Sequence, residues 1–154
     1  MAIRLHLAKL IIVSFLFHPI SLNAQTVIPG GAVSGVWNLS GSPYLVQSAI
    51  IVSDGTTLTI EAGVQVIFQG SYKFLIMGRL LAIGTATDSV TFTATDTTSG
   101  WLGIRFESTP NTNDTSRFEY CKFKYGKANG TSSINSGGGI YIENYSKVKI
   151  NHSK

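Results

Sequence analysis

The side chains best suited to recognising a ligand form an aromatic and charged set, Trp101, Arg105, Tyr141 and Glu143. All four are predicted at outward or edge positions of short strands that could stack in register. Flat rings beside hydrogen-bonding groups suit sugars, because a pyranose ring presents an apolar face as well as hydroxyls. The alternative is that Trp101 covers the end of the core beside Gly100 and Gly103. The pattern therefore gives a candidate carbohydrate patch, with a packing role for its tryptophan as the competing interpretation.

Other chemistries find less support. The loop at residues 111–114 (NTND) is rich in oxygen atoms, but Ca²⁺ takes about six to eight oxygen ligands and one carboxylate is too few. Asx turns are the stronger interpretation of this loop. The acidic residues lie mostly singly, and His152 is the only histidine after position 24, so a Ser-His-Asp site has no support. We predict no catalytic residue, no metal site and no cofactor, and leave open whether the protein is an enzyme.

The elements that must position these residues are short β-strands. From Ile50 onward, runs of β-branched, aliphatic and aromatic residues are closed by turn residues, and their apolar positions alternate with a period of two. The runs cover residues 57–60, 64–68, 73–77, 80–83, 90–94, 101–106, 118–125, 139–143 and 147–150. They leave no room for a helix of ordinary length, so the predicted fold class is all-β.

The connections between the runs favour a solenoid over hairpins. Several, such as residues 61–63, are too short and lack the turn residues of a hairpin, so each would form a corner. A strand then pairs with another about 20 residues later. Residues predicted one rung apart are Leu58 with Leu80, Val66 with Thr91, and Leu75 with Ile104. We predict about three rungs of three strands, with the polar stretches 108–116 and 126–137 as loops on the corners.

Side-chain alternation assigns the interior of each strand. In the run 118–125, Cys121, Phe123 and Tyr125 are predicted to face inward, while Lys122 and Lys124 face water. Other residues expected inside are Leu58, Ile60, Ile104, Phe106, Ile140, Ile142, Val148 and Ile150. Cys121, the only cysteine, is therefore expected to be a buried small hydrophobe rather than a reactive thiol.

Four apolar residues fall at positions predicted to face outward: Ile67, Leu75, Leu81 and Ile83. A contiguous exposed patch of this kind would be adhesive. We expect the segment Val36–Ile51, part of an N-terminal cap at residues 25–52, to fold back over these side chains. Cover by a partner domain is the alternative.

Residues 1–24 have the features of a secretory signal. Arg4 and Lys9 accompany an apolar run of about eight residues, far fewer than the roughly 20 that span a bilayer. Cleavage after Ala24 leaves ten basic and eight acidic side chains, so the net charge falls from +4 to +2. The lysines are spread along strands, so nucleic acid is not an expected partner. We expect an exported protein, secreted, periplasmic or at the cell surface, without a transmembrane anchor.

Five segments match a known pattern in their order along the chain: residues 52–68, 78–85 (GRLLAIGT), 89–93 (SVTFT), 100–106 (GWLGIRF) and 118–126 (FEYCKFKYG). They resemble the secreted right-handed parallel β-helix proteins of bacteria, which have the pectate-lyase-like fold. The resemblance covers roughly residues 35–154 and implies secretion and often contact with polysaccharide, and we place the β-helix itself at residues 53–154. The enzymes of this fold use grouped aspartates, and no such motif can be matched here, so no site residue is carried over.

We therefore expect a secreted or surface-exposed β-helix scaffold for binding or adhesion, with a polysaccharide or cell-surface glycan as its partner. The alternative is the N-terminal part of a polysaccharide lyase or glycoside hydrolase whose active site lies downstream. Both fit the expectation that this chain is a fragment, because it stops directly after a predicted strand and an uncapped rung exposes its edges. Further rungs of the parent chain would then continue beyond Lys154.

Overall fold

The fold is known from a computed structural model that describes residues 24–128 and 137–154. The expected signal segment lies outside these ranges except for Ala24. Within them the chain forms short strands and one 3₁₀ helix, η1 (Leu39–Gly41). The strands build three sheets of five strands each, and all the paired strands run parallel.

The strands alternate between the sheets in chain order. Sheet A consists of β1 (Thr26–Ile28), β4 (Tyr44–Val46), β7 (Gln65–Phe68), β10 (Val90–Ala94) and β13 (Cys121–Phe123). Sheet B consists of β2 (Gly31–Ala32), β5 (Ile50–Val52), β8 (Phe74–Ile76), β11 (Ile104–Phe106) and β14 (Ile140–Ile142). Sheet C consists of β3 (Gly35–Trp37), β6 (Thr57–Ile60), β9 (Arg79–Ile83), β12 (Ser116–Glu119) and β15 (Val148–Asn151).

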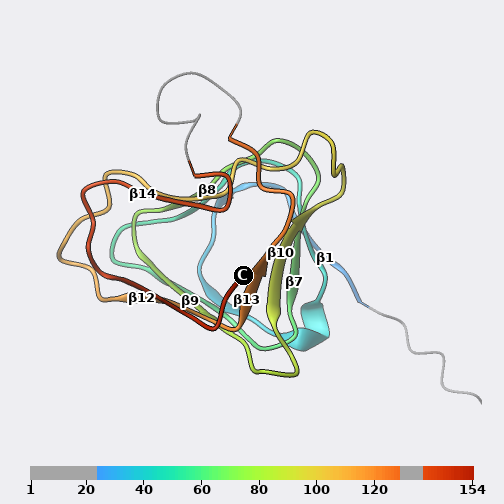
Figure 1. Cartoon of the computed structure of the whole chain (residues 1–154), viewed down its shortest axis with the longest axis horizontal. Helices are drawn as coiled ribbons and strands as arrows, with labels where there is room; N and C mark the ends of the chain where they lie inside the picture. The colour runs from blue at the N-terminus through green and yellow to red at the C-terminus, as the bar shows by residue number, and fades with distance from the viewer. Residues whose placement is uncertain (1–23, 129–136) are drawn as a thin grey trace, which may run out of the picture.

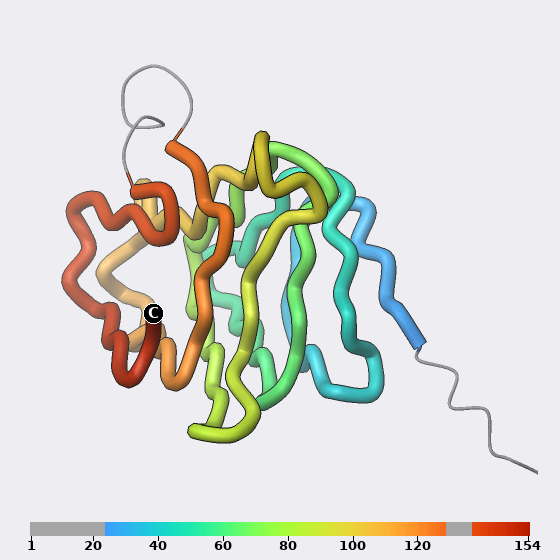
Figure 2. Tube along the Cα trace, turned by 45° about the vertical axis from the view of Figure 1, so that its right-hand side comes forward, coloured from blue at the N-terminus to red at the C-terminus, as the bar shows by residue number. Residues whose placement is uncertain are grey.

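This order makes the chain a right-handed parallel β-helix of the predicted class. Three consecutive strands, one in each sheet, complete one turn, so the five strands of each sheet represent five turns. In Figure 1, β7, β10 and β13 lie on one side of the tube, β8 and β14 on a second, and β9 and β12 on the third. Figure 2 shows the turns side by side, in chain order from blue to red.

The expected rungs after residue 53 correspond to the ten strands β6 to β15, one more than the nine predicted runs because the run 118–125 contains both β12 and β13, and β1 to β5 precede them. The segment 25–52 belongs to the same three sheets, because β1 to β5 pair with the strands that follow. The expectation that Val36–Ile51 folds back over the outer surface is wrong, since this segment is wound into the helix. The boundary expected at residue 53 falls between β5 and β6, within the second turn.

The core is a column of apolar side chains inside the tube. The alternation of strand residues sends every second side chain inward, as in β6, where Leu58 and Ile60 are fully buried. Aromatic rings stack along the column, with centroids 4.5 Å apart for Trp37 and Tyr44 and 5.4 Å apart for Phe92 and Phe123. The Trp37–Tyr44 stack covers the core at the first turn, where both side chains are buried.

The registers between rungs follow from this inward packing. Leu58 pairs with Leu80, as predicted. The other two predicted pairs differ by one residue, because Val66 pairs with Phe92 rather than Thr91, and Ile104 pairs with Phe74 rather than Leu75. A parallel ladder stacks inward residues on inward residues, so buried Val66 requires buried Phe92 as its neighbour.

The run 118–125 is not one strand. Tyr120 adopts a left-handed conformation with φ of 49° and forms the corner between β12 and β13. Phe118 and Cys121 can therefore both face the core, on either side of that corner. Cys121 is buried as predicted. Tyr125 was expected inside but is 47% exposed, because β13 ends at Phe123 and Tyr125 is itself a left-handed corner residue with φ of 58°.

Of the other residues expected inside, Leu58, Ile60, Ile104 and Phe106 are buried there. In the fifth turn, Ile140 and Val148 are partly buried. Ile142 and Ile150 stand in register with buried Phe106 and Phe118, yet they remain 41% and 46% exposed. They form the outermost layer of the core in the described part of the chain.

The four outward apolar residues do not form one patch. Ile67 lies on sheet A, Leu75 on sheet B, and Leu81 and Ile83 on sheet C, so they point to three sides of the tube. Each is half-buried. Side chains of neighbouring turns flank them in the ladders, for example Leu45 next to Ile67 and Ile51 next to Leu75. No covering segment is needed to explain their partial burial.

Candidate functional site

Trp101 lies inside the tube rather than on its surface. Its indole stacks on Phe68 with centroids 4.3 Å apart, and its Nε1 donates a hydrogen bond of 2.9 Å to the carbonyl oxygen of Lys124. Gly100, at φ of 66°, turns the chain into the corner between β10 and β11, which places the next side chain in the core. The expectation that Trp101 belongs to an exposed patch is therefore wrong, and its role is in packing.

Arg105 and Tyr141 are brought together as expected. They pair in register on the outer side of β11 and β14, and the Arg105 guanidinium carbon lies 4.5 Å from the centroid of the Tyr141 ring. Arg105 points outward between the inward-facing Ile104 and Phe106, yet it is only 1% exposed. The guanidinium therefore packs against the half-buried tyrosine ring and is itself shielded from solvent.

Two further charged residues complete this group. The Nε of Arg105 donates a hydrogen bond of 2.6 Å to Oε1 of Glu107, and Nζ of Lys73 lies 4.0 Å from Oε2 of the same carboxylate. Glu107 follows Arg105 by two residues on the same face, a signal that strand alternation could have revealed. Lys73 is brought in by the pairing of β8 with β11, so its partner could not be read from local sequence.

Glu143 lies at the edge of the same surface. It is exposed, and its backbone nitrogen donates a hydrogen bond of 2.9 Å to the carbonyl oxygen of Phe106. This bond continues the ladder of β11 and β14, so Glu143 lies beside Glu107 in the next turn.

We call the group on the outer side of sheet B the Tyr141 cluster, and its members are Lys73, Arg105, Glu107, Tyr141 and Glu143.

The Tyr141 cluster can bind a polar ligand with an apolar face. It offers one aromatic ring, a phenolic hydroxyl and two carboxylates of different exposure. Its two cations and two carboxylates balance in charge, so the surface suits a neutral ligand better than a strongly charged one. Among the described residues, no group of three or more His, Cys, Asp or Glu side chains is placed to hold a metal ion.

In the oxygen-rich loop at residues 111–114, the Asn113 side chain forms hydrogen bonds within the protein. Nδ2 of Asn113 donates to Oδ1 of Asp54 at 2.8 Å and to the carbonyl oxygen of Met77 at 2.9 Å. Its Oδ1 accepts a hydrogen bond of 3.3 Å from the backbone nitrogen of Gly55. Asn113 therefore joins corners of successive turns.

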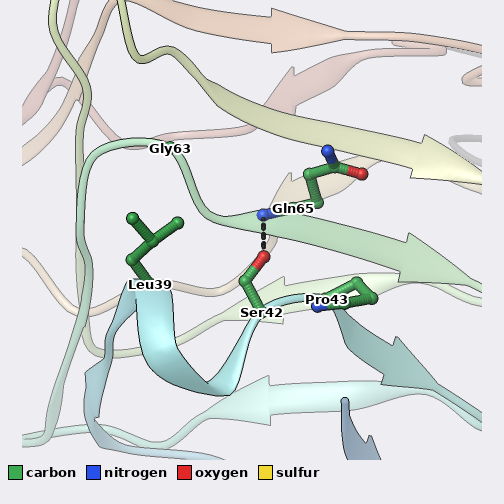
Figure 3. Close-up of a pocket in the computed structure, with 5 residues that line it drawn as sticks. All are labelled: Leu39, Ser42, Pro43, Gly63 and Gln65. Atoms are coloured by element: carbon green, nitrogen blue, oxygen red, sulfur yellow. Dashed lines mark hydrogen bonds between the residues drawn. The ribbon is translucent and has the colours of Figure 1, made fainter. Parts of the chain in front are cut away.

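A shallow hollow lies between η1, β4 and β7 and was not anticipated from the sequence. Its volume is about 490 Å³, and its lining residues are Leu39, Ser42, Pro43, Gly63 and Gln65 (Figure 3). The Oγ of Ser42 accepts a hydrogen bond of 3.0 Å from the Gln65 backbone nitrogen. The lining contains no titratable side chain, so the hollow is unsuited to acid–base chemistry.

The architecture defines the class of protein as a parallel β-helix with a polar and aromatic surface on one sheet. A family model described as the pectate-lyase-like beta helix domain matches residues 32–154, and the chain belongs to this family. Comparisons with curated proteins and with solved structures give no match. No helix in residues 24–128 and 137–154 is long and apolar enough to cross a membrane.

Proposed function

We propose that the protein is a β-helix scaffold that binds carbohydrate through the Tyr141 cluster. The observation that carries the proposal is the half-buried Tyr141 ring, supported by the buried Arg105 guanidinium at 4.5 Å. A ring fixed in this way can stack on a sugar without a large loss of conformational entropy. Membership of a polysaccharide-related family supports the same ligand class.

Within this proposal, each residue has a distinct role. Tyr141 supplies the stacking surface, and exposed Glu143 accepts hydrogen bonds from sugar hydroxyls. Arg105 is a positioning residue, because it holds the tyrosine ring and is itself removed from solvent. Glu107 fixes the guanidinium through the 2.6 Å hydrogen bond.

The test is a binding assay on a panel of soluble polysaccharides, for example xylan, glucan, mannan and polygalacturonate, by affinity electrophoresis and calorimetry. Tyr141→Ala should lower the affinity for the best ligand about ten-fold, the magnitude expected for a lost aromatic contact. Tyr125→Ala is the matched control, since Tyr125 is an exposed tyrosine that lies outside the cluster. Unchanged affinity in Tyr141→Ala, or an equal loss in both variants, contradicts the proposal.

The same preparations test the alternative that the protein belongs to a lyase or hydrolase. A lyase acting on polygalacturonate releases an unsaturated product that absorbs ultraviolet light, and a hydrolase releases reducing ends. We propose binding without turnover for residues 25–154. Product formation that persists in Tyr141→Ala would instead favour catalysis at a different surface.

We further propose that the protein is exported and that residues 1–24 are removed. The support is the basic start and short apolar run of this segment, which lies outside the described residues except for Ala24. The mature protein recovered from a secreting host should begin at Gln25. An amino terminus at Met1 in that preparation contradicts the proposal.

A further inference from the structure

Charge is distributed unevenly along the axis of the β-helix. Residues 24–53, which form the first turn and part of the second, contain no charged side chain. Residues 54–119 contain four basic and seven acidic side chains. Residues 120–154, which contain the fifth turn, carry six lysines and one glutamate. The molecule therefore changes from uncharged, through weakly acidic, to strongly basic along its length.

The basic end is not neutralised from within the protein. Arg79, Arg105 and Arg117 each form an ion pair with a carboxylate, those of Asp114, Glu107 and Glu119 respectively. In contrast, none of the six lysines of residues 120–154 lies within ion-pair distance of a carboxylate in the described part of the chain. Lys147 donates to the carbonyl oxygens of Asn111 and Asn113, and no carboxylate neutralises the charge of the other five.

Three of these lysines share the outer side of sheet A. Lys122 pairs with Thr91 in the ladder of β10 and β13, and the backbone nitrogen of Lys124 donates to the carbonyl oxygen of Phe92. Lys154 continues the sheet, because its backbone nitrogen donates to Cys121 at 2.9 Å and its carbonyl oxygen accepts from Phe123 at 2.8 Å. It therefore stands next to Lys122, one strand further along.

Polar but uncharged residues extend this surface toward the middle of the molecule. Thr91 continues the column of Lys122, and Thr93 stands beside Ile67 in the column that leads to Lys124. Neighbouring strands lie about 4.8 Å apart, and alternate residues along a strand about 6.7 Å apart. We call Thr91, Thr93, Lys122, Lys124 and Lys154 the lysine face.

The acidic residues nearest in sequence lie at the corners and have local partners. Asp88 precedes β10, and its Oδ2 accepts a hydrogen bond of 2.7 Å from the Thr87 hydroxyl. Asp96 follows β10, and its Oδ1 accepts one of 2.8 Å from the Thr98 backbone nitrogen. The outward positions of the described sheet A strands carry neither a carboxylate nor an aromatic ring.

We infer that the lysine face binds a polyanionic polysaccharide whose charges are sulfate or phosphate esters. Lysine binds tetrahedral oxyanions as a point charge, and the arginines, whose guanidinium fork would give bidentate contacts, already have internal partners. The threonine hydroxyls beside the lysines suit a sugar chain, and the absence of rings at the outward strand positions disfavours the stacking that single-stranded nucleic acid uses. This surface is separate from the Tyr141 cluster on sheet B, so the inference does not rest on the proposed function.

The test uses dextran sulfate as the probe, with neutral dextran and polygalacturonate as comparison polymers. The protein should bind dextran sulfate more tightly than polygalacturonate of matched charge density and should not bind neutral dextran at this face. The triple variant Lys122→Gln, Lys124→Gln, Lys154→Gln should bind dextran sulfate about a hundred-fold more weakly. The slope of log affinity against log salt concentration should also fall by about three, one for each cation removed.

A control variant tests whether binding depends on the lysine face or only on the net charge of the protein. Arg79→Gln, Arg117→Gln, Lys149→Gln removes three positive charges from sheet C and should keep most of the affinity. Circular dichroism verifies that both triple variants are folded. Equal losses in the two variants overturn the inference, as does tighter binding to polygalacturonate, to single-stranded DNA or to vesicles of anionic lipid than to dextran sulfate.

Discussion

Cys121 shows how burial controls the chemistry of a single side chain. Its thiol is almost fully buried, and its Sγ lies 3.4 Å from the carbonyl oxygen of Ala82. Burial raises the pKa of the Cys121 thiol to about 12. The thiolate is the reactive form, so native protein should resist alkylating reagents at neutral pH and react rapidly once unfolded. Ready labelling of the native protein, followed by mass spectrometry, would contradict the placement of this strand.

The same pKa shift predicts how stability depends on pH at the alkaline side. The ordinary pKa of the thiol is 9.0, so between about pH 9 and pH 12 the unfolded chain loses its proton while the folded chain keeps it. The unfolded state is favoured by that release, and the free energy of unfolding should fall as the pH rises through this window. Urea titrations at pH 8 and at about pH 10.5 measure the change. Cys121→Ala should show a weaker dependence, with tyrosine ionisation common to both proteins.

Asn113 is predicted to be the most sensitive polar residue of the corner loops. Its amide bonds to Asp54, Gly55 and Met77, so removal leaves several groups without partners. Asn113→Ala should lower the free energy of unfolding by about 2–3 kcal/mol. Thr112→Ala, at an exposed neighbour, is the control and should change it by less than about 0.5 kcal/mol.

Asn113→Asp gives a sharper version of this test. The new carboxylate would face the Asp54 carboxylate, which now accepts a hydrogen bond at 2.8 Å. Like charges at that distance repel, so this variant should be less stable than Asn113→Ala at pH 7 and should regain stability as the pH falls toward 4. Equal stability of the two variants at both pH values would show that the bond to Asp54 contributes little.

At the scale of elements, the corners decide where each strand begins. Tyr120 and His152 both adopt left-handed conformations, with φ of 49° and 50°, and their rings stack with centroids 4.7 Å apart. Both are bulky residues in a region of φ that favours glycine. The stacked rings and the ladders on either side hold these corners. Because tyrosine is not a typical turn residue, alternation alone predicted one strand at 118–125.

Gly78 lies where the backbones of two turns approach closely. A Cβ atom at this position would clash with the backbone carbonyl oxygens of Ser53 and Thr56 in the preceding turn. Because backbone atoms cannot move away as a flexible side chain can, Gly78→Ala should destabilise the protein by roughly 2–4 kcal/mol. Gly55→Ala is the comparison, since nothing lies near its Cβ position and only its positive φ of 71° opposes the substitution. Thermal unfolding of both variants measures the difference, and equal losses would contradict the close approach.

At the scale of the molecule, stability should vary along the axis. In a solenoid each turn contacts only its neighbours, so a turn with covered inward side chains opens less readily. Amides of β7 and β10, whose inward residues are buried, should exchange more slowly than those of β14 and β15, where Ile142 and Ile150 are exposed. Hydrogen exchange followed by mass spectrometry checks this order. Uniform exchange across the turns would show that the described part opens as a single cooperative unit.

The sequence by itself determined the class of fold and most of the core. Strict alternation in strands such as 57–60 and 90–94 fixes which side chains face inward, because a shift of one residue would reverse every side chain. Short corners without hairpin residues then required parallel pairing with a later turn. Alternation within each strand and the short corners were therefore enough to predict that Leu58 pairs with Leu80 and that Arg105 lies beside Tyr141.

Only the tertiary structure decided what happens at corners and between turns. The burial of Trp101, the ion pair of Lys73 with Glu107 and the position of Lys154 beside Lys122 depend on the conformation of corner residues and on the stacking of turns. A corner changes the face to which the next side chain points, and a left-handed tyrosine or histidine gives no periodic signal. Charge shows the same limit, because lysines that are dispersed in the sequence become neighbours only when the turns stack.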